Sequence, residues 1–226
     1  MAATRIVVGL GNPGSEYARA RHNVGFMVVE RLADRWRIVL GRERNGLRIG
    51  SGRVADVAVL LVEPYLYMNL SGQALGHLES AWQTEDLIVV HDDIDLPVGR
   101  VRLRHDGGTG GHRGLMSITD LWGPNFDRVR IGVGRPPQGL DPADYVLQRV
   151  TEPELAELDA VAQRASDAVE CLLANGIRQA MNRFNAREPE GRPAGEGEPG
   201  GDGGTRADAV TQGRTDVANE NERETR

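Results

Sequence analysis

The chain has 226 residues and 39% of them are hydrophobic, which is enough for one substantial buried core. A single cysteine, Cys171, excludes an intramolecular disulfide, and no apolar run approaches transmembrane length, so we expect a soluble, cytoplasmic protein. All 27 basic residues are arginine and stand against 33 acidic residues. This balance neither requires nor excludes a nucleic-acid partner.

The composition divides the chain into a domain over residues 1–185 and a tail over residues 186–226. From Ala186 onward, Gly, Glu, Asp, Arg and Pro dominate, and Val210 and Val217 are the only bulky aliphatic residues. Such a segment cannot bury enough apolar surface to offset the entropy lost on ordering. We therefore predict a disordered tail.

The first structured stretch runs from Thr4 to Phe26. A short apolar run gives way to the glycine-rich turn 9–14, and a polar segment with His22 follows. This order predicts strand, tight turn and helix. Because ligands collect outside the carboxyl ends of strands in α/β proteins, we expect Asn12, Tyr17 and His22 to lie near one another there.

The same turn, GLGNPG, also has the spacing of a dinucleotide-binding fingerprint. In that alternative an acidic residue about 20 positions later should end a second strand. The acidic residue found there, Glu30, lies in a stretch with helical periodicity over residues 26–36, and Pro13 has no N–H to offer a phosphate. A dinucleotide-dependent oxidoreductase is therefore the weaker hypothesis.

Three further strands are expected over residues 37–43, 46–54 and 57–64. The last of them is continuously apolar, as in a strand buried on both faces, and it leads into Tyr67 and Asn69. Asn69 fits two roles, a turn or helix-capping residue or a hydrogen-bond donor to a developing oxyanion.

A second buried strand, over residues 87–90, ends in the sequence HDDID. Carboxylates at a strand end suggest a metal site, a solvated acidic loop, or a carboxylate that orients a histidine. Only Asp106 is near enough in sequence to complete a compact cation site. We favour Asp92 as the residue that orients a histidine.

Two alternating segments, residues 100–104 and 128–131, each place arginines on one face of a predicted strand. The arginines either protect a solvated edge strand or form a patch that contacts phosphates. Between these segments lies HDGGTGGHRG, whose four glycines within five residues would be costly unless the backbone approaches a ligand or adopts positive φ. We expect a binding loop that presents His112 and Arg113 and runs into a helix over residues 115–121.

The domain ends in a helix that begins at Thr151, with Glu154 completing a capping box. We expect Asn175 and Gly176 to stop this helix and a short final helix over residues 177–184 to dock on the core. These positions have the pattern of core residues, so we assign them no chemistry.

Taken together, GLGNPGSEYARARHNVGF, YMNLSG, HDDIDLPVGRVRLR, GGTGGHRG and RVRIGVG occur in the order and spacing of bacterial peptidyl-tRNA hydrolases. The resemblance spans roughly residues 5–185. It implies a single α/β domain with a mixed, mostly parallel twisted sheet flanked by helices. It also implies hydrolysis of the ester between a peptide and the 3′ ribose of tRNA, which recycles tRNA from aborted translation, with peptidyl-tRNA as partner and without cofactor, metal, membrane contact or oligomerisation.

The resemblance also implies roles for individual residues. His22 is the expected general base for the attacking water, and Asp92 is expected to orient it. Asn12 is expected to contact the peptide and help to reject free aminoacyl-tRNA, and Asn69 to bind near the scissile carbonyl. The remaining expected contacts are Tyr17 and Tyr67 at the tRNA terminus, His112 in the substrate site, and Arg104 and Arg130 near the 5′ phosphate of the tRNA.

One residue departs from the family pattern. The glycine loop usually ends in His-Asn-Gly, whereas Arg113 follows His112 in this chain. Asparagine both donates and accepts hydrogen bonds, but arginine only donates them and adds a charge. Arg113 therefore positions the substrate differently, adds a phosphate contact, or marks an RNA-binding relative with weak hydrolysis.

Overall fold

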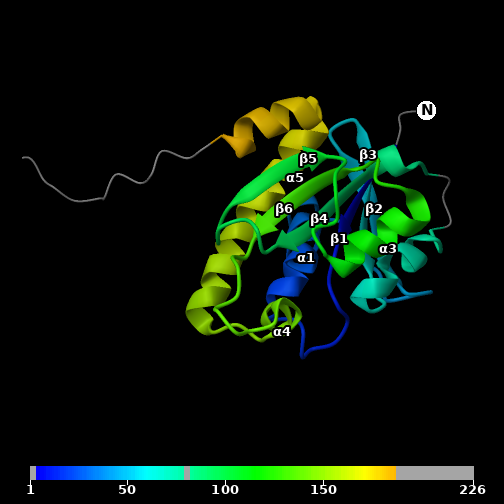
Figure 1. The fold of residues 1–226 in the computed structure, drawn as a ribbon. Coiled ribbons are helices and arrows are strands. Elements are labelled where there is room, and N and C mark those ends of the chain that lie inside the picture. Colours follow the sequence, from blue (N-terminus) through cyan, green and yellow to red (C-terminus); the bar gives the residue numbers. More distant parts are fainter. Residues whose placement is uncertain (1–3, 79–81, 187–226) are drawn as a thin grey trace, which may run out of the picture. The chain divides into compact units, whose positions relative to one another are not determined.

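The computed structural model describes residues 4–78 and 82–186, so nearly all of the predicted tail lies outside the described residues. Its centre is a six-stranded sheet in the order β2-β3-β1-β4-β6-β5 (Figure 1). Neighbours among β3, β1, β4 and β6 are parallel, whereas β2 and β5 are antiparallel edge strands. The mixed, mostly parallel sheet that was expected is confirmed. The strands are β1 (Thr4–Gly9), β2 (Leu47–Val54), β3 (Val57–Pro64), β4 (Leu87–Asp93), β5 (Val101–His105) and β6 (Asp127–Gly132).

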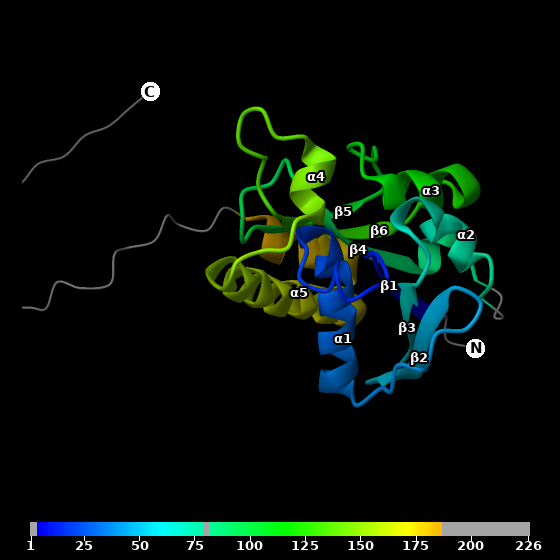
Figure 2. The same cartoon turned by 90° about the horizontal axis from the view of Figure 1, so that it is seen from below.

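Helices cover both faces of the sheet (Figure 2). One face packs against α1 and α5, and the other against α2 and α3, so each face has its own apolar core. Burial on both sides explains why β1, β3 and β4 are almost continuously apolar. The helices are α1 (Val24–Trp36), α2 (Ser71–Leu75), α3 (Arg113–Trp122), α4 (Pro142–Leu147) and α5 (Glu152–Asn185), with short 3₁₀ helices at Arg21–Asn23, Met68–Leu70 and Thr84–Asp86.

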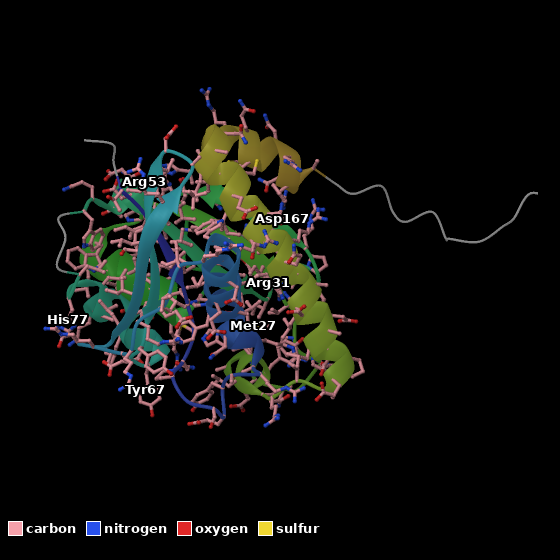
Figure 3. The ribbon with its side chains drawn as sticks, turned by 180° about the vertical axis from the view of Figure 1, so that it is seen from behind. Met27, Arg31, Arg53, Tyr67, His77 and Asp167 are labelled. Carbon is pink, nitrogen blue, oxygen red and sulfur yellow. The ribbon has the colours of Figure 1, made fainter. Side chains whose placement is uncertain are left out.

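Ion pairs and hydrogen bonds connect α1 to α5. Arg35 pairs with Asp167 at 2.8 Å, and Arg31 pairs with Asp159; Figure 3 labels Arg31 and Asp167 on this face. Trp36 donates its indole N–H to Glu170 at 3.0 Å. These contacts fix α1, and therefore the residues just before it, against the rest of the domain.

Two expected elements differ in the structure. Residues 37–43 form no strand, because Arg37 ends α1 in the left-handed conformation with φ 55° and Ile38 then buries its side chain against β2. The first helix begins only at Val24, after a turn-rich loop and the 3₁₀ helix, so no α-helix N-terminus follows the glycine turn directly. This removes the geometry that dinucleotide binding requires.

The C-terminal helix forms much as its sequence indicates. The capping box of Thr151 and Glu154 is present, and the helical path breaks at Gly176, where φ is 78°. As expected, the kink at Gly176 separates two helical segments of α5, and the second segment continues from it to Asn185. Within the described residues, no helix has the length and apolarity needed to cross a membrane.

Candidate active site

A pocket of about 510 Å³ opens at the carboxyl ends of β1 and β4. The start of α1 lies near α4 on this side of the domain (Figure 1). The pocket collects residues from segments far apart in the chain, as expected for a crevice beyond the ends of parallel strands. Eight of the ten predicted site residues line it: Asn12, Tyr17, His22, Tyr67, Asn69, Asp92, His112 and Arg113.

His22 and Asp92 form a buried hydrogen-bonded pair. The Nδ1 of His22 lies 2.8 Å from Oδ1 of Asp92, and both side chains are nearly inaccessible. Because an ionised carboxylate only accepts, Nδ1–H is the donor. The Nε2 atom of His22 is left as the basic nitrogen, without a partner among the described residues.

A second histidine binds the same oxygen. The Nε2 atom of His112 lies 3.0 Å from Oδ1 of Asp92, and the two imidazole rings have their centroids 4.8 Å apart. His112 is also the N-cap of α3, because its Nδ1 accepts hydrogen bonds from the N–H groups of Gly114 and Leu115. The predicted helix therefore begins two residues earlier than expected, at Arg113.

The charges of this cluster follow from burial and pairing. Burial alone would raise the pKa of Asp92, but the adjacent His22 and His112 outweigh it and hold the pKa of this carboxyl well below its usual range. Burial lowers the pKa of His91 to about 3, and the nearby His112 adds to the effect. Asp92 is thus ionised and His91 neutral at physiological pH.

Asn12 is locked in one orientation. Its Oδ1 accepts a hydrogen bond from the N–H of Met68 at 2.8 Å, which leaves the Nδ2 amide group without an acceptor among the described residues. Its backbone is bridged by Asn23, whose side chain accepts from the Asn12 N–H at 3.0 Å and donates to the Asn12 carbonyl at 2.9 Å. Asn12 therefore offers hydrogen-bond donors at the pocket wall.

Four side chains lie at the pocket wall with no hydrogen-bond partner among the described residues: Tyr17, Tyr67, Asn69 and Arg113. Tyr67, labelled in Figure 3, is 61% exposed, and Asn69 and Arg113 are exposed as well. Asp93 and Asp141, which also line the pocket, are already bonded, to Arg130 and to the N-terminus of α4. Arg113 thus places an unpaired positive charge at the rim.

Arg104 and Arg130, the predicted phosphate contacts, lie outside the pocket on β5 and β6. Arg104 is exposed, whereas Arg130 donates from Nε to Asp93 at 2.7 Å. The alternation that suggested two exposed arginines on β6 is wrong for Arg128, which is only 2% exposed. Arg128 instead donates to the carbonyls of Gly107 and Gly108 and so anchors the glycine loop.

Sequence reasoning missed three residues that shape the site: Asn23, His91 and Arg128. Asn23 follows His22 in the sequence, but no local pattern shows that its side-chain amide will bridge the backbone of Asn12. His91 donates from Nδ1 to the carbonyl oxygen of Asp92 at 2.7 Å. Asn23 and Arg128 act through tertiary contacts, which motif spacing does not encode.

His22, Asp92 and His112 are also residue types that bind transition metals, and their ligand atoms lie within 4.8 Å of one another. In the structure, however, each imidazole directs an N–H at the shared carboxylate oxygen. The geometry present is a hydrogen-bonded one, and a metal would have to displace both protons.

Comparison with known proteins identifies the family of the chain. The family model described as peptidyl-tRNA hydrolase matches residues 6–192. Peptidyl-tRNA hydrolases from Mycobacterium avium and Bacillus subtilis are 47% and 45% identical to the chain, over 82% and 80% of it and 100% and 98% of their own lengths.

Solved structures resemble the fold as well. The crystal structure of peptidyl-tRNA hydrolase from Acinetobacter baumannii superposes with a TM-score of 0.75 at 39% identity, covering 82% of this chain and 96% of that one. The sequence matches and the fold match point to the same family, and the chain belongs to the peptidyl-tRNA hydrolase family.

Proposed function

We propose that the protein hydrolyses the ester bond between a peptide and the 3′ ribose of tRNA, in the cytoplasm and as a monomer, and so recycles tRNA from aborted translation. The observation that carries this proposal is the His22–Asp92 pair at the wall of an open pocket. Asp92 holds the Nδ1–H tautomer of His22, which leaves Nε2 to accept a proton from water.

In the proposed reaction, water attacks the ester carbonyl while His22 takes its proton. Asp92 stabilises the imidazolium as it forms, and general-base help of this kind contributes roughly 10²–10⁴-fold. The carbonyl oxygen becomes negative in the tetrahedral intermediate, and Asn69 supplies amide donors near it. Collapse of the intermediate breaks the ester C–O bond, and the 3′ oxygen of the ribose leaves as a hydroxyl with the proton that His22 had taken, which returns His22 to its neutral form. These steps draw on no metal or other cofactor.

Substrate contacts are proposed for the remaining wall. The free Nδ2 donors of Asn12 suit a carbonyl of the peptide, and the aromatic rings of Tyr17 and Tyr67 suit the terminal nucleotides. Arg113 has no partner among the described residues and can donate to a phosphate or a carbonyl there. Arg104 is proposed to contact a tRNA phosphate. Arg130 is proposed to contact one as well, while its Nε remains bonded to Asp93.

A comparison of two substrates tests this proposal. The wild-type protein should release tRNA from N-acetyl-aminoacyl-tRNA much faster than from aminoacyl-tRNA, whose amino group is free and charged. Tight tRNA binding without cleavage of either substrate would instead identify an RNA-binding relative of the family. Measurable binding of NAD(H) would support the dinucleotide alternative.

Asn12→Asp sharpens the same test. Aspartate keeps the oxygen that accepts from Met68, so folding should be preserved, but it loses the amide donors and gains a negative charge. We expect kcat/KM for the blocked substrate to fall by roughly tenfold or more and the preference over aminoacyl-tRNA to shrink. An unchanged preference would show that Asn12 does not contact the peptide.

A further inference from the structure

His112 has no free hydrogen-bonding atom to offer a substrate. Its side chain is only 8% exposed, and both ring nitrogens are already bonded, Nε2 to Asp92 and Nδ1 to the first turn of α3. A residue whose main task is to bind substrate would keep a donor or acceptor free at the pocket. His112 therefore calls for a different role from the substrate contact that the family resemblance implies.

The first turn of α3 fixes the tautomer of His112. The N–H groups of Gly114 and Leu115 approach Nδ1 at 3.1 and 3.4 Å, so Nδ1 must present its lone pair to them. The ring proton then resides on Nε2, which donates it to Oδ1 of Asp92 at 3.0 Å. A second proton, on Nδ1, would face two N–H groups and destroy the cap.

We propose that His112 is a positioning residue that acts on the general base His22 through Asp92. Its fixed Nε2–H holds Oδ1 in place and takes up part of the negative charge of that oxygen. This keeps the carboxylate ionised, holds the ring of His22 in line, and weakens the attraction of Asp92 for the imidazolium.

Several titratable and charged groups surround the cluster. His91 of β4 packs its ring edge-on against His112 and is neutral, and the charge of Arg128 on β6 acts on His91. Arg113 of α3 and Asp141, which precedes α4, lie at the pocket wall. Neither ring nitrogen of His112 is free to take a second proton while the helix cap and the bond to Asp92 persist.

Two substitutions of His112 distinguish its role as the N-cap of α3 from its hydrogen bond to Asp92. His112→Asn retains a good N-cap acceptor, but its side chain is too short to reach Asp92. His112→Gln is longer and can place an amide N–H near the position of Nε2, although it caps less well. The asparagine variant should therefore keep the helix cap and lose the contact with Asp92.

The expected results follow from the lost hydrogen bond. With Asp92 less satisfied, it attracts the His22 imidazolium more strongly, so the acidic limb of the kcat/KM profile of His112→Asn should move up by roughly one pH unit. Its kcat should fall roughly tenfold with KM little changed, because a hydrogen bond to a charged group is lost. His112→Gln should move the limb back toward that of the wild type.

Opposite results would overturn the inference. A raised KM with an unmoved pH limb would make His112 a substrate contact, and a fall in activity that only parallels a lower Tm would make it a structural cap. Because the inference rests on the proposed function, a readout without substrate is needed as well. Imidazole ¹⁵N NMR of the free protein should show His112 as the neutral Nε2–H form; another form refutes the inference, whereas an inactive wild type refutes the function.

Discussion

Two buried carboxylates, Asp92 and Glu63, have pKa values that shift in opposite directions. Asp92 has two imidazole donors beside it and remains ionised. Glu63 has one partner, Arg48 at 2.7 Å, and its Oε1 has none; burial raises its pKa to about 8. The number of donors that reach the buried group therefore decides whether it keeps its charge.

The raised pKa of Glu63 makes stability depend on pH. The folded protein retains this proton to about pH 8, whereas the unfolded chain releases it near 4.5. Between these values the folded state binds more protons, so the free energy of unfolding falls as pH rises. Glu63→Gln, which keeps the hydrogen bond to Arg48, should lessen this fall by on the order of 2 kcal/mol between pH 5 and 8.

Urea denaturation at the two pH values measures the difference. Glu30→Gln is the matched control, because Glu30 lies 3.5 Å from the same Arg48 but its side chain is 55% exposed. It should lessen the fall much less than Glu63→Gln does, because the charge of Glu30 only adds to the effect of burial on the pKa of Glu63. Parallel slopes for the wild type and Glu63→Gln would mean that Glu63 is already ionised in the folded protein.

At the scale of elements, the close contact of α1 with the sheet carries His22 to the pocket. Gly25 makes this contact possible: a Cβ there would lie 2.4 Å from the Leu10 nitrogen and 2.5 Å from the carbonyl oxygens of Leu10 and Val90. Backbone atoms cannot yield as a flexible side chain can. The helix starts directly after the 3₁₀ turn that contains His22. The distance of α1 from the sheet therefore sets the position of His22.

Gly25→Ala should therefore force α1 away from β1 and β4 and destabilise the domain by roughly 3 kcal/mol. Thermal or urea unfolding measures the loss. Gly108→Ala is a suitable control, since an added Cβ there meets nothing within 4 Å. Equal stability of the two variants would contradict the tight packing of α1.

Element types with strong patterns could be predicted from the sequence, and those fixed by tertiary contacts could not. The buried strands β3 and β4 and the capping box of α5 have local signals. In residues 37–43 polar and apolar side chains alternate as in a strand. These residues nevertheless form no strand, because Arg37 is left-handed and the side chain of Ile38 is buried. Arg128 alternates like a surface residue but is covered by the carbonyls of the glycine loop.

At the scale of the whole molecule, tRNA must reach beyond the pocket to an outer surface. The register of β5 and β6 places Arg102 opposite Arg130 and Arg104 opposite Arg128. Of these four, Arg128 is buried and Arg130 is bonded to Asp93, so Arg102 and Arg104 are the exposed charges. A macromolecular substrate would meet these two first.

Replacing both Arg102 and Arg104 by Ala should weaken tRNA-linked substrates and lower the slope of log KM against log salt by about two. Arg53→Ala is the control, because Arg53 is exposed on β2 at the opposite edge of the sheet (Figure 3). A short N-acetyl-aminoacyl ester without the tRNA body should be cleaved equally by all variants. Equal losses on both substrates would contradict a role in binding the tRNA body.

The sequence predicted which residues form the candidate site better than it predicted the hydrogen bonds between them. Motif order identified His22, Asp92 and Asn12, because each lies at or just after the end of a strand or turn at the same sheet edge. The sharing of one Asp92 oxygen by two histidines and the support from Asn23 depend on side-chain directions set by packing. Spacing along the chain does not contain that information.

Single-turnover hydrolysis of N-acetyl-aminoacyl-tRNA in EDTA, by the wild type and by His22→Ala, tests the central claim most directly. The wild type should cleave the ester at the same rate with and without EDTA, and the variant should be slower by roughly 10²-fold or more. A variant as fast as the wild type, or a wild type that EDTA inactivates, would contradict a metal-free general base at His22.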